Sequence, residues 1–113
     1  MSGNVIRAQG VEQIGKSSKR ILPYSMEELA GRDFTVSSVS FDLIDRLGVK
    51  KVAGRAGVVL TGNRIIELTL LTTDTDVEGE YLLEAVLVLS TAENFILVQQ
   101  VVIVDTEKEA LVA

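Results

Sequence analysis

Two stretches near the C-terminal end decide the fold: residues 80–89 (EYLLEAVLVL) and residues 95–104 (FILVQQVVIV). Both are rich in aliphatic and β-branched residues, and the turn-forming residues 90–94 (STAEN) separate them. The pattern predicts a β-hairpin. A sheet with one wet face alternates apolar and polar residues, whereas the only polar residues of the second stretch are Gln99 and Gln100. Both faces of this hairpin are therefore expected to be covered by protein.

Further strands are predicted upstream of the hairpin. Residues 35–43 (TVSSVSFDL) alternate apolar and polar side chains, as a half-buried strand does. Residues 55–61 and 64–72 flank Gly62-Asn63, a two-residue hairpin signal. Residues 19–24 are expected to form an edge strand, because their proline cannot donate to a ladder.

The helical signal is short. Ser25-Met-Glu-Glu28 is a capping box, and Gly31 follows as a stop, so one or two helical turns are expected there. The chain length fits a single domain. We expect three segments: an extended or loosely ordered N-terminal arm at 1–18, a β-sandwich domain at 19–105 and a C-terminal tail at 106–113.

Tyr81 specifies the type of sandwich. A tyrosine at the start of a late strand resembles the tyrosine corner of immunoglobulin-like sandwiches, whose hydroxyl closes the corner by a backbone hydrogen bond. Leu83 stands where antibody domains place a cysteine, so the resemblance is to the architecture alone. The expected fold is therefore all-β: an antiparallel immunoglobulin-like β-sandwich with one short helical turn and an extended N-terminal arm.

Composition argues against catalysis. The 113 residues include no histidine and no cysteine, which removes the commonest general base, the thiolate nucleophile and the usual metal ligands. We expect no enzyme activity, no catalytic residue and no cofactor. Asp74-x-Asp76-x-Glu78-Gly79 resembles the start of a calcium loop, but the twelfth position is Ala85 instead of glutamate. A solvated acidic loop is the favoured interpretation, and cation binding at 74–80 stays open.

Charge is segregated along the chain. Residues 1–65 hold ten Lys/Arg and six Asp/Glu (+4), and residues 66–113 hold one and ten (-9), which gives the net charge of -5. Such a chain can attract copies of itself head to tail, although a solvated surface with segregated signs is equally expected. The net negative charge and the lack of exposed aromatic residues for base stacking argue against nucleic-acid binding. No apolar run is long enough for a membrane-spanning helix.

The outward side of the hairpin needs a cover, which is either the N-terminal arm or a neighbouring subunit. If Tyr81 points inward, so do Leu83, Ala85 and Leu87, because side chains alternate along a strand. The expected assembly interface then consists of outward hairpin residues and apolar residues of the arm. These are Leu82, Val86, Val88, Val5, Ile6, Val11 and Ile14.

The order of features resembles a known family, the small tail- and fibre-adaptor proteins of tailed bacteriophages. The matching stretches are Leu22-Pro-Tyr-Ser25, residues 26–29, Val36-Ser-Ser-Val-Ser-Phe41, Gly79-Glu-Tyr-Leu-Leu83 and residues 101–104. The resemblance implies a non-enzymatic virion structural protein, assembled in the host cytoplasm, that joins tail or neck and fibre components through a multi-copy ring. Its expected partners are other copies of itself and neighbouring virion proteins, and a small-molecule ligand is not expected.

Two alternatives remain open at this point. A capsid decoration protein would have the same sequence features as an adaptor. A receptor- or carbohydrate-binding sandwich would use exposed aromatic residues, but the five aromatic residues of this chain mostly read as core.

Overall fold

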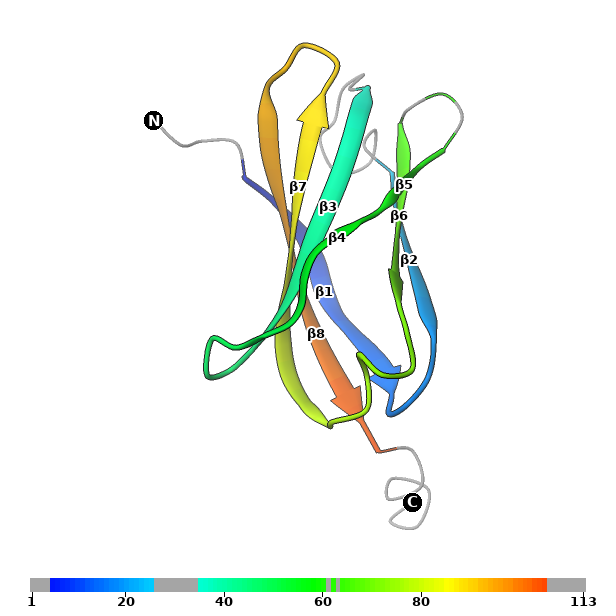
Figure 1. Ribbon diagram of the computed structural model, residues 1–113, viewed down its shortest axis with the longest axis vertical. Helices are drawn as coiled ribbons and strands as arrows, with labels where there is room; N and C mark the ends of the chain where they lie inside the picture. The colour runs from blue at the N-terminus through cyan, green and yellow to red at the C-terminus, as the bar shows by residue number, and fades with distance from the viewer. Residues whose placement is uncertain (1–4, 26–34, 61, 63, 106–113) are drawn as a thin grey trace.

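The computed structural model describes residues 5–25, 35–60, 62 and 64–105. Within these residues the chain is all-β, with eight strands and no helix (Figure 1). The strands are β1 (Val5–Gly15), β2 (Arg20–Ser25), β3 (Val36–Asp45), β4 (Lys50–Ala56), β5 (Val58–Val59), β6 (Ile65–Leu70), β7 (Gly79–Leu89) and β8 (Asn94–Val104).

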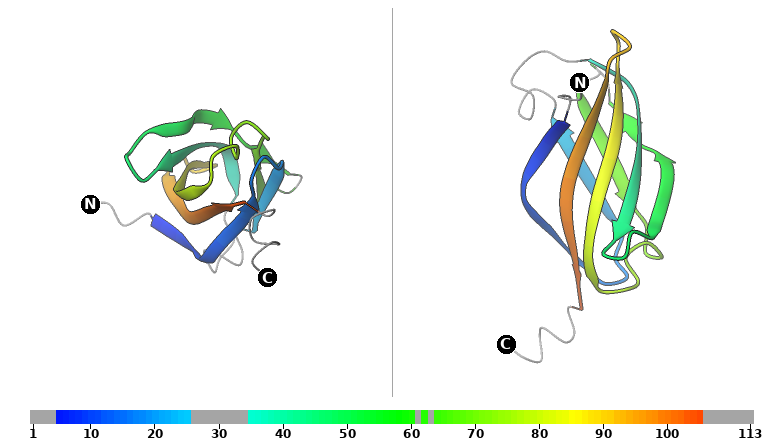
Figure 2. Two further views of the ribbon diagram at one scale, coloured as in Figure 1. Left: turned by 90° about the horizontal axis from the view of Figure 1, so that it is seen from below. Right: turned by 90° about the vertical axis from the view of Figure 1, so that its left-hand side faces the viewer.

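The strands form two sheets that pack face to face. The larger sheet has the order β1-β8-β7-β3-β4, and the smaller has the order β2-β6-β5 (Figure 1). Seen from below, the larger sheet curves around the smaller one (Figure 2, left). The predicted all-β sandwich is confirmed. The predicted helical turn falls mostly within 26–34, and the predicted tail is 106–113; both lie outside the described residues.

The predicted C-terminal hairpin forms the centre of the larger sheet. β7 and β8 pair antiparallel from Gly79↔Ile103 to Val88↔Asn94. On β7, Leu83 and Leu87 are fully buried, because side chains on one phase of the strand face the smaller sheet. The apolar core lies between the sheets and includes Phe41 of β3.

Three other strand predictions also hold. Residues 35–43 correspond to β3 and residues 64–72 to β6. β2 covers the segment predicted at 19–24, and it is an edge strand of the smaller sheet, as its proline requires. β5 and β6 form the predicted antiparallel hairpin, and Gly62 between them has φ +93°, a value that glycine adopts without strain.

The N-terminal segment differs from the expectation. Residues 5–15 are extended, but they are hydrogen-bonded as β1 alongside β8 and do not form a loose arm. The pairing is parallel, so the larger sheet is mixed: the predicted antiparallel arrangement is wrong for this pair and is confirmed for the other strand pairs. β1 does not lie over the hairpin. It extends the same sheet by one strand, because its backbone groups satisfy the open edge of β8.

The segment predicted as one strand at 55–61 is divided between the two sheets. β4 ends at Ala56, and after Gly57 alone the chain continues as β5 in the other sheet (Figure 1). Sheet switching through a bend of this kind closes a corner of a sandwich. No helix in the described part of the chain is long and apolar enough to cross a bilayer.

Candidate functional site

The surface of the larger sheet that faces away from the core carries a cluster of aliphatic side chains. We call this surface the outer face. Its apolar members include Val5, Leu82, Val86, Val88, Ile96 and Val98, which lie on β1, β7 and β8 and are exposed or half-buried. In the side view, no described segment crosses in front of these strands (Figure 2, right). Contiguous aliphatic side chains left in water are typical of association surfaces.

The strand registers explain why these side chains gather. Val5 pairs with Ile96 on β8, and Ile96 pairs with Val86 on β7. Cross-strand partners lie side by side on the same face of a sheet. Three adjacent strands therefore contribute one continuous apolar row, whose members each keep 40–46% of their surface exposed.

The structure distributes the predicted interface residues between two places. Leu82 and Val86 are exposed and Val88 is half-buried, so the predicted phase of β7 is confirmed. Val5 joins them on the outer face, and Val11 is exposed further along β1.

The prediction that Ile6 and Ile14 belong to the interface is wrong. Ile6 is 8% exposed and Ile14 is 1% exposed, because both lie on the phase of β1 that faces the smaller sheet. They belong to the hydrophobic core and are not available to a partner.

Tyr81 forms the predicted corner. Its hydroxyl donates a hydrogen bond to the carbonyl oxygen of Val77, at 2.8 Å. Its ring is buried, and this burial raises the pKa of the hydroxyl. The inward direction of Tyr81 fixes the phase of β7, and through it the residues that reach the outer face.

β1 carries a bulge beside the outer face. Between Arg7↔Val98 and Val11↔Gln100 it contains two more residues than β8 does. Opposite this bulge lies Gln99, a polar side chain with 3% exposure. Its amide nitrogen donates to the Gly10 carbonyl at 3.2 Å, and its amide oxygen accepts from the Tyr24 hydroxyl at 3.1 Å. Gln99 thus joins the larger sheet to the smaller one and holds the bulge in place.

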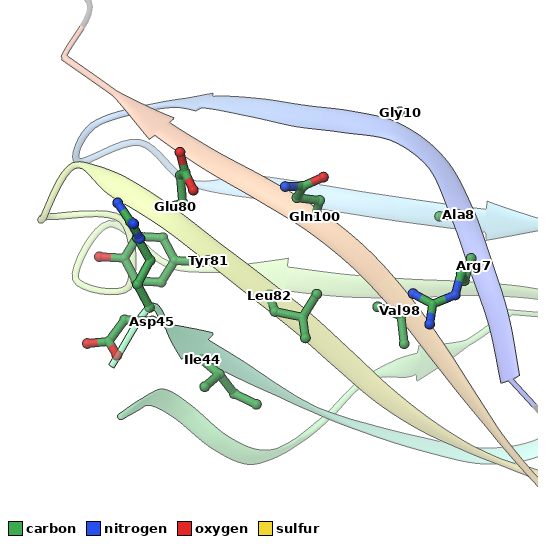
Figure 3. Close-up of a pocket in the computed structure, with 11 residues that line it drawn as sticks. Arg7, Ala8, Gly10, Ile44, Asp45, Glu80, Tyr81, Leu82, Val98 and Gln100 are labelled. Atoms are coloured by element: carbon green, nitrogen blue, oxygen red, sulfur yellow. The ribbon is translucent and has the colours of Figure 1, made fainter. Parts of the chain in front are cut away.

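The bulge borders a shallow groove of about 530 Å³ at one end of the outer face (Figure 3). Arg7 extends from β1 toward Val98, and Leu82 and Gln100 form part of the floor (Figure 3). Glu80 and Asp45 add carboxylates to its far end. Leu82 and Val98 belong both to the outer face and to the lining of the groove, so we treat the two as one surface.

Two acidic residues of the loop after β6 form ion pairs with basic side chains of the same chain. Asp74 is 4% exposed; it pairs with Arg55 and accepts a hydrogen bond from the Leu71 amide at 2.6 Å. Asp76 pairs with Lys51 at 2.7 Å. Burial alone would raise the pKa of Asp74, but the hydrogen bonds from Arg55 and Leu71 outweigh it and hold the pKa below its ordinary value.

These pairs bear on the calcium resemblance and on the segregated charge. Two of the carboxylates that a cation would need already have cationic partners. The described part of the chain contains no group of three or more His, Cys, Asp or Glu placed to hold a metal. Both pairs also join the basic half of the chain to its acidic half, so part of the segregated charge is neutralised within one molecule.

Sequence reasoning missed three residues of the outer face. Ile96 and Val98 belong to the hairpin that was singled out, but their phase follows only from the register with β7. The position of Arg7 next to Val98 depends on the parallel pairing of β1. No local pattern in residues 1–15 indicates that pairing.

Comparisons with known proteins give a likeness of fold. No protein-family model matches the chain, and no curated protein matches it. Among solved structures, it is similar to CopC from Methylosinus trichosporium OB3b, with a TM-score of 0.59 and 12% identity over 84% of each chain. It is also similar to part of the 2,6-sialyltransferase of Vibrionaceae Photobacterium sp. JT-ISH-224, with a TM-score of 0.50 and 12% identity. That match covers 92% of this chain but only 19% of the sialyltransferase. At this identity both likenesses concern the fold alone.

Proposed function

We propose that this protein is a non-catalytic assembly subunit that associates through its outer face. The observation that carries the proposal is the apolar row of Val5, Val86 and Ile96, which is exposed on three adjacent strands. An N-terminal arm folded over the hairpin would have covered this row, but β1 lies beside the hairpin in the same sheet. Among the residues that the structure describes, none covers the row, and this supports a second protein as its cover.

The specific role that we propose is that of a virion structural protein of a tailed bacteriophage, an adaptor that joins tail or neck components to fibres in multiple copies. The sequence resemblance over most of residues 20–105 supports it. We also propose that the sandwich is of the immunoglobulin-like type. The Tyr81–Val77 hydrogen bond supports this assignment, since the same corner is a recurrent feature of that architecture.

Mass measurement in solution tests the assembly role. We expect the wild-type chain to exceed the monomer mass in size-exclusion chromatography with light scattering, and Val86→Asp to elute as a folded monomer. The control is Val58→Asp, which places the same charge on an exposed valine of the smaller sheet. A wild-type protein that is monomeric at every concentration would refute self-association. Absence of the chain from purified phage particles would refute the virion role separately.

A further inference from the structure

We propose that the outer face pairs with the outer face of a second copy of this chain, about a two-fold axis that runs along β8. This inference rests on the proposed assembly role and specifies its partner and geometry. It follows from the order of residues in two cross-strand rows of the outer face. The first row is Val5, Ile96 and Val86, and the second is Arg7, Val98 and Glu84, each running from β1 through β8 to β7.

A two-fold axis along β8 places β1 of one copy against β7 of the other. In the first row, Val5 then meets Val86 of the second copy, and Ile96 meets its own equivalent. In the second row, Arg7 meets Glu84 of the second copy, and the two Val98 side chains face each other. Apolar groups thus meet apolar groups, and the cation meets the anion, twice in each pair by symmetry.

The two charged groups are available for this contact. Arg7 is exposed and Glu84 is half-buried, and neither forms an ion pair with another described residue. Within one chain β8 lies between them, so their strands are about 10 Å apart, two strand spacings. Arg7 also reaches over the face toward Val98, and so toward the axis that we propose (Figure 3).

An axis along the neighbouring strand β7 would be unfavourable. It would place Glu84 against Glu84 of the second copy, two like charges in contact. It would also place Ile96 against Ser40 and Val98 against Asp42, because these β3 residues continue the same rows beyond β7. The order of side chains therefore selects β8.

The contacts between the two copies are still possible when the twist of the sheets is considered. Stacked sheets cross at about 30°, which displaces a residue one strand from the axis by only about 2–3 Å along the strand. Arginine is long enough to follow such a shift. The paired surface amounts to about 500 Å² on each copy, close to the lower limit of specific interfaces. We therefore expect a reversible pair whose population depends on concentration.

A charge exchange tests the axis. In sedimentation equilibrium of the full chain, Arg7→Glu and Glu84→Arg should each raise the dissociation constant of the pair by about tenfold or more, because each brings two like-charged contacts together. The double variant Arg7→Glu/Glu84→Arg should return to within about threefold of the wild type, since it restores both contacts. Lys19→Glu, the same change of charge in the turn before β2, is the control and should have no effect.

The outcomes separate this inference from the proposed function. If the wild type self-associates and the double variant is no better than the single ones, the two-fold axis is wrong and the assembly role stands. If the wild type is a monomer throughout, both fail. Arg7→Gln and Glu84→Gln give a milder pair of variants, and thermal melts of each sample verify that a loss of association is not a loss of fold.

Discussion

Removal of the Asp74 carboxylate should destabilise the fold more than removal of any exposed acid. The carboxylate accepts hydrogen bonds from both terminal nitrogens of Arg55, one of them at 3.2 Å, and from the Leu71 amide at 2.6 Å. Loss of one partner of a buried pair costs about 3–5 kcal/mol. The Arg55 side chain keeps 32% of its surface in water and still donates to the Thr69 carbonyl. We therefore expect Asp74→Ala to cost about 2–3 kcal/mol.

Urea denaturation at neutral pH measures this cost, and Asp76→Ala provides the matched control. Asp76 pairs with Lys51 in the same loop, but both side chains are substantially exposed. Its removal should cost clearly less than removal of Asp74, because exposed ion pairs contribute little to stability. Equal effects of the two variants, or no effect of Asp74→Ala, would contradict the view that the Arg55–Asp74 pair stabilises the loop after β6.

The same pair predicts a pH dependence. The pKa of Asp74 is lower in the folded chain than in the unfolded one, so its contribution is complete above the ordinary carboxyl pKa of about 3.9. It is lost as the pH falls through the folded value. The difference in unfolding free energy between wild type and Asp74→Ala should therefore be constant near neutrality and should become smaller as the pH falls below about 4. Urea denaturation of both proteins at a series of pH values measures this difference.

Three further changes test other parts of the fold by thermal or chemical denaturation. Tyr81→Phe removes only the hydroxyl that donates to the Val77 carbonyl and should lower the free energy of unfolding by about 1 kcal/mol. An unchanged free energy of unfolding would show that this hydrogen bond does not stabilise the fold. Gly57→Ala should cost about 1–3 kcal/mol, since its added carbon would lie 2.7 Å from a methyl of Val39. Gln99→Leu should cost about 1–3 kcal/mol by stranding the buried Tyr24 hydroxyl, and an unchanged midpoint would count against the bridge.

The elements that were predictable from sequence are those whose pattern is local. β3, β7 and β8 alternate or continue apolar runs over at least nine residues, and Tyr81 supplies the phase of β7. Because the period of a strand is two, one correctly placed residue orients all the others. The exposed positions of Leu82 and Val86 follow from that single side chain.

The parts that were not predictable depend on pairing between distant segments. β1 has no clear period of its own, because its bulge interrupts the alternation and its stabilisation comes from the open edge of β8. The burial of Ile6 and Ile14 follows from that pairing and from nothing local. The Arg55–Asp74 pair likewise joins residues whose sequence context identifies neither as a partner.

Cross-linking through one introduced thiol tests most directly whether a second copy covers the outer face. The natural chain has no cysteine, so a single introduced thiol reports one surface without interference. Ile96→Cys lies on the proposed axis and Val58→Cys on the smaller sheet, and both positions are exposed. With a short bismaleimide, at a chain concentration above the dissociation constant of the wild-type pair, we expect covalent dimers of Ile96→Cys alone. Equal cross-linking of both variants, or none at Ile96→Cys, would contradict it.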